Sequence, residues 1–217
     1  MTSKKVHPDF VLVSLSLDEV QSAVHHAMDR TKEIVRQFIP KKSALNHLET
    51  NYIGMLGELA VRNWAGIDEE LIQDYTDHKP DEGDLDLNGK VYDIKTEAIP
   101  EKWFLKLQTG GIRKFDPYGC RVFTEKHYHH IKKYSGGIIF CSLPVKDGET
   151  AKDEKIRESL LLTRDIMITG FISPEEIGSK NPTWYTPKNP KGGRRKYNSK
   201  NYIFHHTDLT PVRQILK

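Results

Sequence analysis

The amino-acid sequence predicts an α/β protein, because it contains two helical stretches, one β-hairpin and two apolar runs of strand length. The helical stretches cover residues 16–38 and 42–64, where apolar side chains recur at intervals of three and four. A hairpin is expected at residues 88–89, an Asn-Gly pair, since a two-residue type I′ turn needs positive φ at both central positions. The runs 136–143 and 166–172 are typical of buried strands.

The length and composition predict a globular protein with one core. The chain has 217 residues, and we expect a single domain over all of them. No apolar run approaches the ~20 residues that a membrane span requires, and the first residues do not have the pattern of a signal peptide. The two cysteines, Cys120 and Cys141, are too few for a disulfide framework, so we expect a cytoplasmic protein without membrane contact.

The charged residues are unevenly distributed along the chain. Residues 58–101 contain thirteen acidic and four basic side chains, whereas residues 102–133 contain eight basic and two acidic ones. Residues 188–200 contain six basic side chains and no acidic one. An acidic centre between basic stretches suits a protein that holds metal ions and binds a polyanion around them, although the solvated faces of an ordinary globular protein also produce charge runs.

Several further segments have an expected structure. Residues 10–15 alternate like an edge strand or an arm, and residues 16–40 form the expected N-terminal helical region. Residues 101–119, with aromatic side chains among basic ones, are expected to be loop-like, and residues 123–134 a short helix. Residues 179–200 are rich in Pro, Gly, Lys and Arg and are expected to form a long, basic, flexible loop.

The hairpin determines which side chains share a face of the sheet. With the turn at residues 88–89, Asp84 lies opposite Asp93, and Lys95 follows one pleat further on the same face. Two carboxylates about 5 Å apart on neighbouring strands repel each other, and a divalent cation with oxygen ligands compensates that repulsion. We therefore expect a metal-dependent phosphodiesterase site on this face. The other face is apolar and is expected in the core: Leu85, Leu87, Tyr92 and Ile94.

The helix before the hairpin contains an acidic residue in an otherwise apolar, glycine-containing turn. Gly54 and Gly57 lie within one turn of Glu58, and each glycine costs about 1 kcal/mol relative to alanine inside a helix. The glycine pair therefore indicates close approach of another part of the chain. Glu58 is a candidate for the same site, with an ordinary solvent-facing glutamate as the alternative.

These residues together resemble the motif of the PD-(D/E)XK nuclease superfamily, which has the restriction-endonuclease-like fold. The match consists of the helical Gly-Glu pair at 57–58, the Gly-Asp pair at 83–84 and the Asp-Ile-Lys run at 93–95, and it covers residues 50–97 directly. The resemblance implies a central mixed β-sheet flanked by helices, with an αβββαβ core.

The resemblance also implies a role for each matching residue. Asp84, Asp93 and the backbone carbonyl of Ile94 would bind Mg²⁺, with Mn²⁺ able to substitute, and Glu58 would be a further ligand, directly or through water. Lys95 would orient the attacking water and favour its deprotonation. Phosphodiester cleavage requires charge neutralisation and a hydroxide-like nucleophile, and a bound Mg²⁺ serves both needs.

The sequence leaves three further acids open as ligands. A proline, Pro80, precedes Asp81 rather than Asp84, so the Pro-Asp doublet is not at the position that the hairpin selects. Asp81 or Asp86 is therefore an alternative ligand. Glu97 lies on the Asp93 face and is either an outer ligand or a partner for Lys95.

The resulting prediction is a Mg²⁺-dependent deoxyribonuclease, and an endonuclease is favoured over an exonuclease. A homodimer is compatible with cutting both strands of a duplex. The alternatives are an inactive nucleic-acid-binding module on the same fold, an RNA-directed nuclease, and a zinc protein that uses adjacent histidine pairs; the last is disfavoured because no metal-spaced Cys/His cluster exists. The basic side chains expected to contact DNA are Lys102, Lys106, Arg113, Lys114, Lys132, Lys133, Lys191, Arg194, Arg195 and Lys196.

Overall fold

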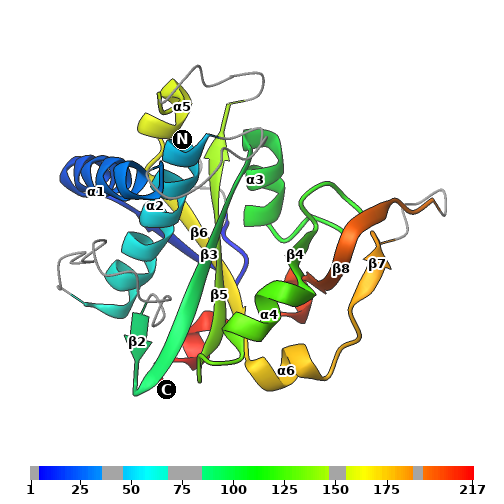
Figure 1. Cartoon of the computed structure of the whole chain (residues 1–217). Helices are drawn as coiled ribbons and strands as arrows, with labels where there is room; N and C mark the ends of the chain where they lie inside the picture. The colour runs from blue at the N-terminus through cyan, green and yellow to red at the C-terminus, as the bar shows by residue number, and fades with distance from the viewer. Residues whose placement is uncertain (1–4, 36–45, 68–84, 147–154, 188–192) are drawn as a thin grey trace.

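The computed structural model describes residues 5–35, 46–67, 85–146, 155–187 and 193–217 (Figure 1). Within these ranges the α/β class is confirmed, and the centre of the fold is a five-stranded mixed sheet. Its strands lie in the order β1 (Val11–Ser14), β6 (Asp165–Ile172), β5 (Gly137–Val145), β3 (Lys90–Pro100) and β2 (Leu85–Leu87). The expected edge strand near the N-terminus is confirmed as β1.

The direction of the strands makes the sheet mixed. β3 and β5 are parallel, whereas β1 with β6, β6 with β5, and β2 with β3 are antiparallel. A parallel pair requires a crossover connection. Here the connection contains α3 (Glu101–Gln108), β4 (Cys120–Thr124) and α4 (Glu125–Ile131).

Two long helices, α1 (Leu17–Val35) and α2 (His47–Ala65), pack together beside the central sheet (Figure 1). Helix α2 begins at a capping box, in which the Asn46 side chain accepts from the backbone of Glu49 and the Glu49 side chain accepts from the backbone of Asn46. It ends at Gly66, which has φ of 71° and a left-handed conformation that glycine adopts without steric cost. Both expected helices are therefore confirmed where the structure describes them.

Helix α2 contacts β3 closely through one glycine. A Cβ atom added at Gly57 would overlap the side chain of Thr96, whereas a Cβ at Gly54 would meet nothing within 4 Å. The close approach that the glycine pair indicated is therefore real at Gly57 and lies against the face of β3 that carries Thr96. The same face contributes Tyr92 and Ile94 to the main core.

The opposite face of the central sheet is covered partly by a second sheet, which the expectation of helices on both faces did not include. Within the described ranges this sheet has three antiparallel strands, in the order β4, β8 (Lys196–His205) and β7 (Thr183–Tyr185). Phe123 of β4 and Phe204 of β8 stack with ring centroids 5.8 Å apart and share a core with Phe140 of β5. The second sheet thereby places β4 beside β3 and β5.

Two short expected elements are corrected by the structure. Residues 101–108 form α3 rather than a loop, because Phe104 and Leu107 pack on Ile99 and Met167, and Pro100 precedes the helix instead of interrupting it. The helix expected over residues 123–134 begins at Glu125, after the end of β4.

The expected flexible loop over residues 179–200 is also wrong in part. It contains β7 and the first half of β8, and residues 188–192 lie outside the described ranges. Residues 196–200 alternate between exposed and partly buried side chains, as an exposed hairpin strand does, and their basic composition hides this alternation.

The remaining elements are short. They are α5 (Glu158–Leu161), α6 (Pro174–Gly178) and the 3₁₀ turns η1 (His206–Asp208) and η2 (Val212–Gln214). Helix α5 is a single turn that buries Leu160. None of the helices in the described ranges combines the length and apolar character needed to cross a membrane.

Candidate active site

The hairpin has the predicted turn and register. Asn88 and Gly89 have φ of 53° and 74°, as a type I′ turn requires. The described pairs are Leu85 with Tyr92, Asp86 with Val91 and Leu87 with Lys90. The predicted core face is confirmed, because Leu85, Leu87, Tyr92 and Ile94 are all buried. Asp84, like Asp81, lies outside the described residues.

Asp93 and Lys95 are brought together on the other face of β3. The Lys95 ammonium Nζ donates to Asp93 Oδ1 at 2.7 Å. Asp93 is buried, whereas 39% of the Lys95 side chain is exposed, so the pair connects a carboxylate inside the protein with solvent. This is the arrangement that the strand alternation predicts for the two residues.

Ile94 has its side chain in the core, and its possible role concerns only its backbone carbonyl. In a two-residue hairpin the residues flanking the turn exchange backbone hydrogen bonds, and so do the residues two positions further along each strand. Tyr92 therefore directs its backbone groups toward β2, and the carbonyl of Ile94 points to the same side.

Glu58 is buried, so the solvent-facing alternative is wrong. Its Oε1 atom lies 3.9 Å from Nη1 of Arg30 on α1. Glu58 belongs to the helix that covers the Thr96 face of β3, whereas Asp93 and Lys95 belong to the opposite face. Among the described residues, no three His, Cys, Asp or Glu side chains form a metal-binding group.

The other two acids that the sequence left open have structural contacts. Asp86 is exposed, and its Oδ1 atom accepts the backbone N–H of Gly89 at 2.9 Å, which stabilises the turn. Glu97 forms an ion pair with Arg121 of β4. Glu97 is therefore joined to the second sheet.

Arg121 connects the two sheets through a buried guanidinium. Its Nη2 atom donates to Ser142 Oγ on β5 at 2.6 Å and to Thr169 Oγ1 on β6 at 3.1 Å. Burial lowers the pKa of Arg121 to about 9, with a small opposing effect of Cys141, so the side chain stays charged at neutral pH. Arg121 could not be recognised from the sequence, because its partners come from strands far away in the chain.

A cavity of about 340 Å³ lies between the two sheets next to Lys95. Its polar lining includes Lys95, Glu97, Arg121 and His127. Its volume is in the range of sites that hold a small molecule or one part of a larger ligand. The cavity gives the Lys95 ammonium a space in which a substrate group can reach it.

A second hollow, which we call the basic groove, is lined by residues 114–120 and by residues near the start of β8. It has a volume of about 510 Å³, and Lys114, Arg194 and Arg195 are among its lining residues. Val122 of β4 lines both the basic groove and the cavity next to Lys95. The two hollows therefore lie beside the same strand, β4.

The other basic residues expected to contact DNA are dispersed. Lys106 of α3 pairs with Asp116 at 2.5 Å and lies over the ring of Trp103. Lys196 lies over the ring of Trp184. Lys191 is outside the described residues. The remaining four are exposed and do not line the groove: Lys102, Arg113, Lys132 and Lys133.

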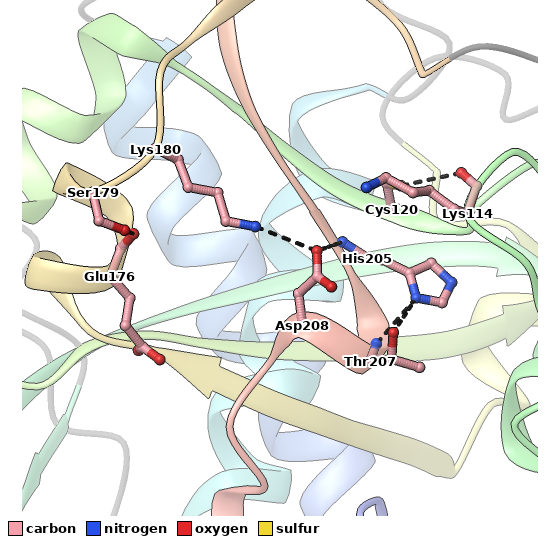
Figure 2. Close-up of polar contacts among 8 residues, drawn as sticks. All are labelled: Lys114, Cys120, Glu176, Ser179, Lys180, His205, Thr207 and Asp208. Carbon is pink, nitrogen blue, oxygen red and sulfur yellow. Dashed lines mark hydrogen bonds and ion pairs between the residues drawn. The ribbon is translucent and has the colours of Figure 1, made fainter.

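The cysteine and histidine residues beside the groove have structural roles. Cys120 is paired with His205 across β4 and β8, and the Cys120 thiol donates to the carbonyl of Lys114 at 3.1 Å (Figure 2). Burial raises the pKa of Cys120 to about 11, whereas a reactive or metal-binding cysteine requires a lowered pKa. The His205 ring contacts the Thr207 hydroxyl, and the backbone N–H of His205 donates to the Asp208 carboxylate (Figure 2). Asp208 also pairs with Lys180.

Comparison of the chain with family models, with curated proteins and with solved structures gives no match. The function is therefore inferred from the side chains around Lys95 and from the groove that adjoins them.

Proposed function

We propose that the protein is a Mg²⁺-dependent endonuclease that hydrolyses phosphodiester bonds in DNA. One observation carries the proposal: Lys95, which is hydrogen-bonded to Asp93, lines a cavity beside β4, and the basic groove lies beside the same strand. A carboxylate–ammonium pair beside a cationic groove suits the cleavage of a polyanion.

The order of the described elements supports a restriction-endonuclease-like core. Helix α2, strands β2 and β3, helix α3 and strand β5 occur in this order, with β4 and α4 inserted between α3 and β5. Strand β5 is parallel to β3. An αβββαβ core would need one further strand between α2 and β2, in a segment that includes residues 68–84 outside the described ranges. We propose membership of the PD-(D/E)XK superfamily on this order together with the Asp-Ile-Lys run.

The donor atoms near Lys95 fit a Mg²⁺ ion. The Asp93 carboxylate and the Ile94 carbonyl are hard oxygen donors of the kind that Mg²⁺ prefers, and Asp84 is proposed as a further ligand. Glu58 is not included, because its helix covers the other face of β3. When bound, the cation would supply a hydroxide-like nucleophile near neutral pH and neutralise charge on the phosphate.

The chain's own residues have separate tasks in this proposal. Lys95 holds the attacking water and presents a fixed positive charge where negative charge develops on the phosphate. Asp93 holds the Lys95 ammonium in place through their hydrogen bond. The side chains of Lys114, Arg194 and Arg195 retain the DNA backbone in the adjoining groove.

Incubation with a covalently closed plasmid tests the proposal. With Mg²⁺ or Mn²⁺ the purified protein should nick or linearise the circle, and EDTA should abolish this activity. A closed circle has no ends, so its cleavage also establishes the endonuclease mode. Cleavage that persists in EDTA would contradict the proposal. So would a failure to cleave both plasmid and single-stranded DNA in the presence of either metal. Cleavage of RNA alone would identify an RNA-directed enzyme instead.

A further inference from the structure

We infer that the basic groove binds unpaired DNA, with Phe115 and Tyr118 stacking on bases while the basic side chains of the groove contact phosphates. The inference rests on the proposed function for the choice of DNA as the polyanion. It adds the substrate class, a segment with unpaired bases, either in a single strand or in an opened stretch of a plasmid.

Exposed aromatic rings line the groove next to the cationic side chains. Phe115 is 45% exposed and Tyr118 is 39% exposed, and both line the groove together with Tyr197. Aromatic side chains that interleave with basic ones form the usual surface for single strands, because every base offers a face on which a ring can stack. In a duplex these faces are covered by the neighbouring bases.

The loop that carries the two rings is held by its own hydrogen bonds. The carboxylate of Asp116 accepts the backbone N–H of Arg113 at 2.9 Å and the ammonium of Lys106 at 2.5 Å. The backbone N–H of Gly119 donates to the carbonyl of Asp116 at 3.0 Å, and the Cys120 thiol donates to the Lys114 carbonyl across the base of the loop (Figure 2). The raised pKa of Cys120 keeps this thiol protonated, so it remains a donor at neutral pH.

Tyr118 is further fixed in an unusual backbone conformation. Its φ is 61°, in the left-handed region that residues other than glycine rarely adopt. His206, which is buried, donates from Nε2 to the carbonyl of Tyr118 at 2.9 Å. Burial, together with the charge of Arg121, lowers the pKa of His206 to about 3, so its ring is neutral at pH 7 and Nε2 carries the proton in this bond. A strained residue that its surroundings hold in place is typical of functional sites.

The position of the groove connects this surface with the proposed chemistry. Val122 lines both the groove and the cavity next to Lys95, so the two hollows lie beside the same strand, β4. A strand that stacks on Phe115 and Tyr118 therefore lies on the part of the molecule that also carries Lys95.

Binding measurements without metal test the inference. We would measure, by fluorescence anisotropy in EDTA, the affinity of the whole protein for a labelled single-stranded oligonucleotide and for the duplex of the same sequence. The single strand should bind more tightly. In the Phe115→Leu/Tyr118→Leu variant the single-strand affinity should fall roughly tenfold or more, while duplex affinity should change less than about twofold. Leu162→Ala, at an exposed side chain that lines a different cavity, should leave both affinities unchanged.

A charge-reversal variant measures separately how much the phosphate contacts contribute to DNA affinity. The Arg194→Glu/Arg195→Glu variant should bind single-stranded DNA more weakly and with a smaller dependence on salt. The slope of log affinity against log salt should fall by about one unit for each phosphate that the variant no longer neutralises. Thermal unfolding should show that each variant is folded.

The outcomes separate this inference from the proposed function. Three results would each overturn the inference. The first is equal or tighter binding of the duplex, and the second is an unchanged single-strand affinity in the folded Phe115→Leu/Tyr118→Leu variant. The third is tighter binding of RNA than of DNA of the same sequence. Cleavage of the same oligonucleotides by the wild-type protein with Mg²⁺ is measured independently. If the protein cleaves DNA but binds single strands no more tightly than duplexes, only the inference about the groove is overturned. If it binds single strands more tightly but cleaves nothing, the proposed nuclease activity is overturned and the groove assignment is supported.

Discussion

Replacement of Asp93 by asparagine, or of Lys95 by methionine, is expected to lower the rate of plasmid cleavage at least about 100-fold while DNA binding is retained. Asparagine keeps the shape of aspartate but removes its charge, and methionine keeps most of the lysine stem but removes the ammonium. Each change therefore removes one end of the contact between Lys95 Nζ and Asp93 Oδ1. The rate is measured from the conversion of closed circles to nicked circles with enzyme in excess.

Matched controls keep this prediction specific. Asp18→Asn and Lys155→Met remove the same charges at exposed positions away from the cavity and the groove, and both should cleave at the wild-type rate. If Asp93→Asn and Lys95→Met also cleave at the wild-type rate, the assignment of the site is wrong.

The Arg121→Met variant is expected to have a free energy of unfolding about 3 kcal/mol lower than the wild-type protein, because removal of one partner leaves a poorly solvated charge behind. The variant cannot form the ion pair with Glu97 or donate to the hydroxyls of Ser142 and Thr169. The substitution also loosens the attachment of β4, which lines both the cavity and the groove. Chemical denaturation measures the effect.

A second variant distinguishes the effect of the ion pair from the effect of packing. Arg121→Met/Glu97→Gln removes both charges, so it should be more stable than Arg121→Met by a part of the difference. Glu97 is 33% exposed, which limits this recovery through solvent screening. A double variant less stable than the single variant would show that the charge of Glu97 is not the source of the destabilisation.

The parts of the fold that local chemistry determines could be predicted from the sequence. The hairpin depends on two adjacent residues with positive φ, so its register and the faces of Tyr92, Asp93 and Lys95 followed directly. The strand character of residues 196–200, the first half of β8, was missed, since five residues of exposed, basic strand look like a loop in composition. Helix α3 was missed because eight residues contain only two turns of the helical pattern.

The parts that depend on distant contacts could not be predicted. Arg121 meets partners on three strands of the central sheet, and nothing next to it in the sequence indicates them. Glu58 was recognised as unusual from its glycine neighbours, but its contact with Arg30 depends on how α1 packs on α2. The placement of the two hollows beside β4 depends on the second sheet, which was not expected.

The most direct test of the account is a crystal structure of the protein grown with Mn²⁺ and recorded for anomalous scattering. We predict an anomalous peak in contact with the Asp93 carboxylate, with the Asp84 side chain directed to the same ion, and disappearance of that peak in Asp93→Asn crystals. A structure in which Mn²⁺ is absent from Asp93 at saturating concentration, or in which Asp84 points away from Asp93, would contradict the proposed metal site.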